Sequence, residues 1–119
     1  MDKTLSDDAL IVFEHITYGK ENAILLSDLS ALTGKNKRTI KKCVQEIRDA
    51  GNPVVSSSYG GYFLPRRYSD DDIAEAERFC NMQRSQAISR FRSARSVKRW
   101  LNYLGQISME EDYGEDYGY

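Results

Sequence analysis

One segment of the chain concentrates side chains whose chemistry suits contact with a nucleic acid. A helix predicted over residues 36–50 places long basic and amide side chains on one face, with no apolar member. These are Arg38, Lys41, Lys42 and Gln45. The opposite face carries an apolar seam at i, i+4 and i+7, formed by Ile40, Val44 and Ile47. Lys and Arg neutralise phosphates, and Arg and Gln read base edges through paired hydrogen bonds. The pattern therefore predicts an apolar back for packing and a basic front for DNA.

Residue types that serve as nucleophiles, bases and metal ligands form no recognisable set. The single histidine, His15, follows Glu14 on a predicted helix, and no Ser–His–Asp arrangement can be proposed around it. Cys43 and Cys80 lack metal-ligand spacing. Gly60-Gly61 stands between two predicted strands rather than before a helix, so it is a turn and not a phosphate-binding loop. We expect no catalytic residues, no cofactor and no metal.

The elements before the basic helix are predicted to brace it. Ser6 is the expected N-cap of a first helix, in which Leu10, Phe13 and Ile16 form the apolar stripe. A short strand is expected over residues 23–26. Ser27 is then the expected cap of a second helix, with Leu29 and Leu32 facing inward and Gly34 closing it in a left-handed conformation. Asn36 caps the basic helix that follows.

A hairpin is predicted directly after the basic helix. Gly51-Asn52-Pro53 ends the helix, residues 54–58 form one strand, and residues 62–64 form the return strand. The order helix, strand, helix, turn, basic helix and hairpin is that of a winged helix-turn-helix, in which one helix holds the next against the ~12 Å major groove. The predicted fold class is therefore mainly α (α+β), a winged helix-turn-helix followed by a long C-terminal helix or helical pair.

Four local motifs support the same fold by resemblance. They are Gly34, Asn36-Lys37-Arg38-Thr39-Ile40, Arg48-Asp49-Ala50-Gly51 and Gly60-Gly61-Tyr62-Phe63-Leu64. Together they resemble the turn, helix start, helix end and wing of the winged helix-turn-helix in bacterial biotin repressors and in WYL and DeoR-like regulators. The resemblance covers roughly residues 8–65. Because only about 55 residues follow, the biotin chemistry and effector sensing of those regulators are not expected here. The compact plan is also similar to that of small bacteriophage and prophage proteins.

The resemblance implies DNA contacts by the start of the basic helix and by wing residues Ser57, Ser58 and Tyr59. From the residue types we expect phosphate contacts at Lys35, Lys37, Lys41, Arg66 and Arg67, and base contacts at Arg38, Lys42 and Gln45. The complete predicted DNA-binding set is Lys35, Asn36, Lys37, Arg38, Thr39, Lys41, Lys42, Gln45, Ser57, Ser58, Tyr59, Arg66 and Arg67.

Beyond Ser69, a predicted N-cap with Asp72 as the capping-box carboxylate, no Pro or Gly interrupts the chain up to Leu104. One long helix, or two with a break in the Ser-rich 85–96 region, would fit. Its apolar stripe is the predicted dimerisation surface: Ile73, Ala76, Cys80, Ala87, Phe91, Ala94, Val97, Leu101 and Leu104. Packing of the stripe on its own domain stays open as an alternative, and phosphate contacts from the segment Arg84 to Arg99 can accompany either arrangement.

Charges alternate in blocks that the net charge of −1 conceals. Residues 35–67 hold eight bases and two acids, residues 68–83 five acids and one base, and residues 84–105 six bases and no acid. Some of the later bases do not share one face: Arg90, Arg92, Arg95, Lys98 and Arg99. They could pair with the acidic block of an antiparallel second copy. Residues 106–119 hold five acids and are expected to be a disordered tail.

We therefore expect a DNA-binding domain at residues 1–66, a helical segment at 67–105 and an acidic tail at 106–119. No apolar run approaches the ~20 residues of a membrane span, and no signal-peptide pattern is present, so we expect a protein of the bacterial host cytoplasm. The predicted function is sequence-specific binding of double-stranded DNA by a homodimer that regulates transcription. The alternative is an adaptor or inhibitor that uses the same scaffold and the C-terminal helix on a protein partner.

Overall fold

Three short helices begin and end largely where local chemistry places them. The computed structural model describes the backbone of residues 4–112 and the side chains of residues 4–106. Helix α1 spans Asp7–Glu14, and the Ser6 hydroxyl accepts the Ala9 amide as its N-cap. Helix α3 spans Lys37–Asp49 with Asn36 as N-cap, and Gly34 ends α2 at φ 73°. The predictions of both caps and of the left-handed glycine are confirmed.

Helix α2, Leu26–Thr33, begins earlier than predicted. Its N-cap is Leu25, which makes no side-chain capping bond, so the prediction of Ser27 as the cap is wrong. The reason is that Leu25 pairs with Gly61 across the sheet, which holds Leu25 in an extended conformation and lets the helix start at once. Leu32 is also outside the core, with 62% of its surface exposed, whereas Leu29 is fully buried as expected.

A three-stranded antiparallel sheet completes this part of the chain. Strands β1 (Ile24–Leu25), β2 (Val55–Ser56) and β3 (Gly61–Phe63) lie in the order β1-β3-β2, after a 3-10 turn at Lys20–Asn22. The predicted hairpin is confirmed, with a first strand shorter than expected and a return strand of the expected length that begins one residue earlier. Gly61 is required by packing, because a Cβ there would lie 2.9 Å from the Ala23 Cβ.

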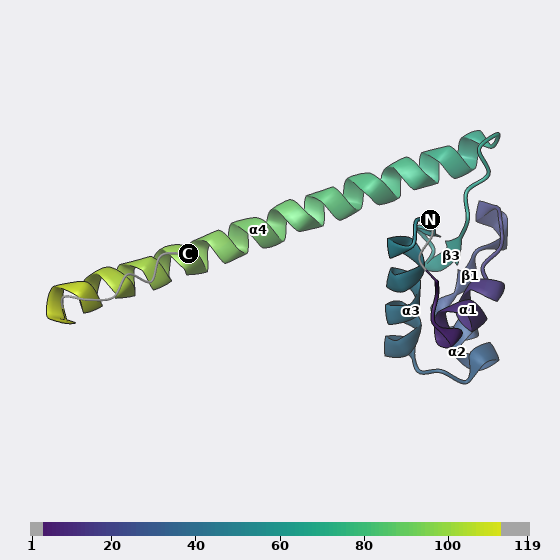
Figure 1. Cartoon of the computed structure of the whole chain (residues 1–119). Coiled ribbons are helices and arrows are strands. Elements are labelled where there is room, and N and C mark those ends of the chain that lie inside the picture. The colour runs from purple at the N-terminus through teal and green to yellow at the C-terminus, as the bar shows by residue number, and fades with distance from the viewer. Residues whose placement is uncertain (1–3, 113–119) are drawn as a thin grey trace. The chain divides into compact units, whose positions relative to one another are not determined.

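The core lies where the helices meet the sheet, and Figure 1 shows α1, α2 and α3 side by side around it. The seam of α3 is buried as predicted. In α1, however, Ala9 and Val12 are buried while Leu10 is 46% exposed. The Ser6 amide and hydroxyl both donate to the Glu46 carboxylate on α3, at 2.6 and 2.9 Å, which sets the rotation of α1. The core cluster consists of Ala9, Val12, Ile16, Leu29, Ile40, Cys43, Val44, Ile47, Val54, Tyr62 and Leu64.

The C-terminal part is one unbroken helix, α4, over Asp70–Asp112. This settles the choice between one helix and two, and it contradicts the expectation that the disordered tail starts at residue 106. Residues 113–119 lie outside the described part. The chain forms two compact units, Met1–Cys80 and Asn81–Tyr119, so the first three turns of α4 belong to the first unit, whereas we expected the boundary near residue 66.

The molecule is thus mostly helical, with a small antiparallel sheet and a long C-terminal helix, as the α+β prediction states. Within the part of the chain that the structure describes, no helix is both long and apolar enough to cross a bilayer.

Candidate nucleic-acid interface

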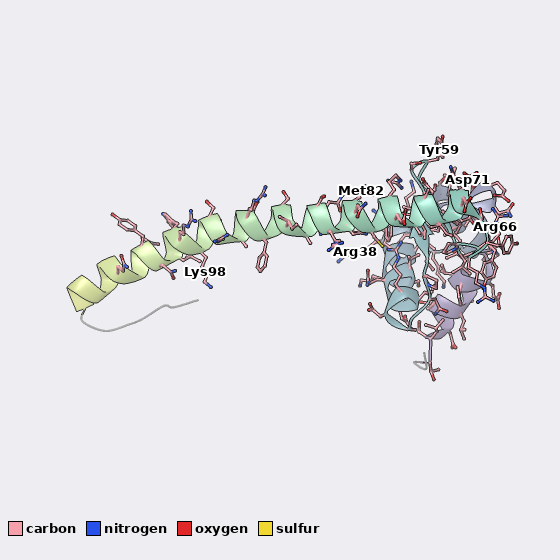
Figure 2. The ribbon with its side chains drawn as sticks, turned by 90° about the horizontal axis from the view of Figure 1, so that it is seen from above. Arg38, Tyr59, Arg66, Asp71, Met82 and Lys98 are labelled. Carbon is pink, nitrogen blue, oxygen red and sulfur yellow. The ribbon has the colours of Figure 1, made fainter. Side chains whose placement is uncertain are left out.

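The outer face of α3 presents its basic side chains to solvent. Lys37, Arg38, Lys41 and Lys42 are all exposed, and Arg38 projects from α3 in Figure 2. Among the side chains of residues 4–106, none of the four forms an ion pair. Gln45 is exposed and donates to Asp49 one turn later, at 2.8 Å. The face therefore carries a cluster of positive charge that the surrounding fold does not neutralise.

The interior side of α3 fixes that orientation. Ile40, Val44 and Ile47 are essentially fully buried, so the helix cannot rotate without exposing them. At the N-terminus of α3 the Asn36 Oδ1 accepts a hydrogen bond from the Thr39 amide at 2.8 Å, so Asn36 is the N-cap. The side chain of Thr39 is half-buried. Burial of the seam and the cap together hold Arg38 and its neighbours outward.

Lys35, at the turn between α2 and α3, is not part of the free basic surface. Its ammonium group lies 2.7 Å from the Asp8 carboxylate of α1, and only 17% of its side chain is exposed. Its carbonyl accepts the Ser30 hydroxyl at 2.6 Å. Lys35 thus joins α1 to the α2–α3 turn, and its charge is already paired.

The tip of the β2–β3 hairpin offers one free side chain of the three expected there. Ser57 is buried, and its Oγ accepts the amides of Gly61 and Tyr59 at 3.1 and 3.3 Å. The Ser58 amide and hydroxyl both donate to the Glu75 carboxylate, at 2.7 and 3.0 Å. Tyr59 is 82% exposed and extends from the hairpin in Figure 2. Ser57 and Ser58 therefore shape the turn, and Tyr59 alone of the three is available to a partner.

Arg66 is held by two carboxylates, so its guanidinium is not free to make the phosphate contact that we expected. Its Nη1 and Nη2 lie 2.7 and 2.8 Å from the Glu21 oxygens, and its Nε lies 2.8 Å from the buried Asp72 carboxylate. The adjacent Arg67 is exposed. The hydrogen bonds that Arg66 donates to Asp72 and Glu21 raise the pKa of Arg66, and those accepted from Arg66 lower the pKa of Asp72 far below its usual range. The network joins the η1 turn, the segment after β3 and the start of α4.

The capping-box prediction for α4 is half right. The Asp72 amide donates to the Ser69 hydroxyl at 3.2 Å, so Ser69 is the cap. The Asp72 carboxylate does not return to the Ser69 amide, which instead donates to the Arg66 carbonyl. Asp72 accepts from the amides of Lys20 and Arg66, at 3.0 and 2.9 Å. The Arg66 guanidinium gives the Asp72 carboxylate hydrogen bonds between two charged groups, which are stronger than the bond that the neutral Ser69 amide would give.

Two residues that position the hairpin escaped the sequence analysis. Glu75, whose pKa is lowered chiefly by the hydrogen bond from the Ser58 amide, ties the turn to α4. Arg48, at the end of α3, donates to the Val54 carbonyl and the Ser56 hydroxyl and stacks on the Phe79 ring at 4.7 Å. Burial lowers the pKa of Arg48. The signal available for Arg48 was its place in the helix-end motif, and no local signal marks Glu75.

The expected dimerisation residues lie along α4 within an arc of about 140° at 100° per residue. Ile73 and Leu104 are each 39% exposed, Val97 is 56% exposed and Phe91 is 78% exposed. Cys80, Ala87 and Ala94 are also exposed, and Ala76 and Leu101 are half-buried. Much of this apolar surface is therefore uncovered by the described side chains.

The residues considered for catalysis are dispersed. His15 is half-buried at the end of α1, and Cys43 is buried in the core, where burial raises the pKa of its thiol. Cys80 is exposed on α4. Over the described residues, no group of three or more His, Cys, Asp or Glu side chains is placed to hold a metal ion.

No protein-family model, curated protein or solved structure matches this chain. The interpretation of the site therefore depends on its own geometry and charge.

Proposed function

We propose that this chain binds duplex DNA sequence-specifically and regulates transcription by occupying an operator. In this proposal α2 and α3 act as a helix-turn-helix and the β2–β3 hairpin acts as its wing. The observation that carries the proposal is the outer face of α3, where four exposed bases lack an ion-pair partner among the described side chains, opposite a fully buried seam. A helix with that design fits the ~12 Å major groove, since its polar side faces outward as one surface.

The role proposed for each side chain of the α3 face follows from its chemistry. Lys37 and Lys41 neutralise phosphates, because an ammonium group is a compact charge without directional preference. Arg38, Lys42 and Gln45 read base edges, Arg to guanine and Gln to adenine through paired hydrogen bonds. The existing bond from Gln45 to Asp49 is solvent-exposed, so exchanging it for a base costs little.

The hairpin supplies a backbone contact through Tyr59. Its hydroxyl and, separately, the guanidinium of Arg67 suit phosphate oxygens, since both donate hydrogen bonds and both side chains are exposed. The bonds from Ser58 to Glu75 hold the turn in one conformation before DNA arrives. Preorganisation of this kind lowers the ordering cost of binding.

We further propose that the apolar residues of α4 associate with a second copy of the chain. Phe91 and Val97 are exposed, and they lie on the apolar face of α4. A helix with an exposed apolar face gains stability from a partner that buries this face. Two copies would present two recognition helices, which is how helix-turn-helix proteins read repeated half-sites. The same exposed residues favour the alternative function, an adaptor that places α4 on a different protein.

Salt dependence separates the two functions. Affinity for a random-sequence 30-base-pair duplex is measured between 50 and 500 mM salt for the wild type, Arg38→Ala, Lys41→Ala and the control Lys20→Ala. Each phosphate contact contributes a slope of about 0.9 in log K against log salt. We expect Lys41→Ala to lower the slope by about one and Lys20→Ala, which removes a base away from α3, to leave it unchanged. A weak, salt-independent interaction would contradict DNA binding and favour the adaptor.

A further inference from the structure

The continuity of α4 determines which residues of its second part share a face. Because α4 runs without a break through residues 81–106, each residue there advances about 100° around one axis. This stretch contains six bases, all of them between residues 84 and 99, and no acid. A uniformly positive helix is more consistent with an anionic partner than with an ordinary solvent-facing surface, where both signs are mixed.

Four of the six bases line up. Arg84, Arg92, Arg95 and Arg99 fall within an arc of about 80°, and we call this set the arginine stripe. Asn81, Asn102 and Gln106 continue the same strip at helical spacing. The two other bases, Arg90 and Lys98, lie outside the arc. The bases considered from the sequence did not share a face because that set included Arg90 and Lys98 and omitted Arg84.

The arginine stripe is open to solvent. All four guanidinium side chains are exposed, whereas Lys98, off the stripe, is half-buried. Among the side chains described for residues 4–106, none of the four has an ion-pair or hydrogen-bond partner. Their charge is therefore not offset by the described part of the protein.

We propose that the arginine stripe binds the phosphate backbone of duplex DNA and adds a sequence-independent contact to that of α3. Guanidinium groups pair with phosphate oxygens in two parallel hydrogen bonds, and the amides of Asn81, Asn102 and Gln106 donate to the same oxygens. From Arg84 to Arg99 the stripe is about 22 Å long at 1.5 Å per residue. A duplex presents on the order of a dozen charges over that length.

This inference rests on the proposed DNA-binding function and deepens it. An acidic protein is the competing partner. A regular line of arginines and uncharged hydrogen-bond donors matches an evenly charged backbone better, because a protein interface depends on a few central anchors.

The test compares two double variants of the full chain that remove the same charge. Arg92→Gln with Arg95→Gln affects the arginine stripe, and Arg90→Gln with Lys98→Gln affects the same helix away from it. Binding to a random-sequence 30-base-pair duplex is measured across salt concentrations, with helix content checked by circular dichroism. We expect the stripe variant to lower the salt slope by about 1.8 and the control to change it by less than about 0.5. Equal changes in both variants, or none in either, would overturn the proposal.

A third variant separates this proposal from the proposed function of α3. If Lys37→Ala with Lys41→Ala, which removes the phosphate contacts assigned to α3, leaves binding unchanged while the stripe variant weakens it, the stripe stands and the function assigned to α3 fails. If the α3 variant loses binding and the stripe variant does not, the stripe proposal fails alone. Binding of the wild type to polyglutamate but not to the duplex would overturn the stripe in favour of an acidic protein partner.

Discussion

Substitution of Asp72 should lower the free energy of unfolding of the first unit, because its carboxylate is the centre of a polar network. Its carboxylate is fully buried and accepts four hydrogen bonds. Oδ1 accepts from the Lys20 amide and from Arg66 Nη2, at 3.0 and 3.2 Å. Oδ2 accepts from the Arg66 amide and Nε, at 2.9 and 2.8 Å. Asp72→Asn keeps one oxygen and replaces the other with an NH2 group, so two of the four bonds are lost.

The size of the loss follows from those two bonds. A hydrogen bond to a charged group contributes about 1.5–3 kcal/mol net, and removing one partner of a buried ion pair costs about 3–5 kcal/mol. We therefore expect Asp72→Asn to lower the free energy of unfolding by about 3 kcal/mol at pH 7. Urea unfolding followed by circular dichroism measures it. Asp71→Asn is the matched control, because Asp71 is also in the first turn of α4 but is exposed.

The pH dependence of this difference has a defined sign. Because the pKa of Asp72 is lowered in the folded protein, its contribution is complete above the ordinary carboxyl pKa of about 3.9. The contribution is lost as the pH falls through the lowered value. The difference between wild type and Asp72→Asn should therefore shrink below about pH 4. A loss under about 1 kcal/mol at pH 7, or an equal loss in Asp71→Asn, would refute the role given to the network.

Three further predictions concern recognition, the hairpin and association. Arg38→Ala should cost about 1–3 kcal/mol on the best DNA site and relax specificity there, whereas an equal loss on random DNA would limit Arg38 to phosphate contact. Glu75→Gln should speed hydrogen exchange of the Ser58 amide about 10–100-fold at pH 7. The exchange rate of the wild type should approach that of the variant as the pH falls below about 4.3 and through the lowered pKa of Glu75. An unchanged exchange rate in the variant would contradict the anchoring role of Glu75. Phe91→Glu should convert a dimer to a monomer in sedimentation equilibrium, and a monomeric wild type would contradict the proposed association.

Local chemistry was sufficient to predict most of the elements. The caps Ser6 and Asn36 and the left-handed Gly34 depend on bonds and conformations within a few residues, so residue type alone indicates them. The two faces of α3 follow from helical periodicity, and the structure buries one and exposes the other. The start of α2 was mispredicted because strand pairing, a tertiary contact, decides the conformation of Leu25.

The partners of polar side chains could not be predicted in the same way. Arg66 pairs with Glu21, 45 positions away, and Ser58 pairs with Glu75, 17 positions away. No periodicity in the sequence links such distant residues. The charge of Arg66 and the hydroxyl of Ser58 therefore suggested DNA contacts instead. The continuity of α4 was also beyond the sequence, because its Ser-rich middle fits either one helix or two, and only continuity fixes which arginines share a face.

The most direct test of the central proposal is selection from a pool of random duplex DNA, with recovery of the bound sequences at 50 and 200 mM salt. We expect an enriched motif whose binding weakens steeply with salt, and a two-fold repeat in that motif if two copies bind together. Absence of binding even at the lower salt would contradict DNA recognition by α3.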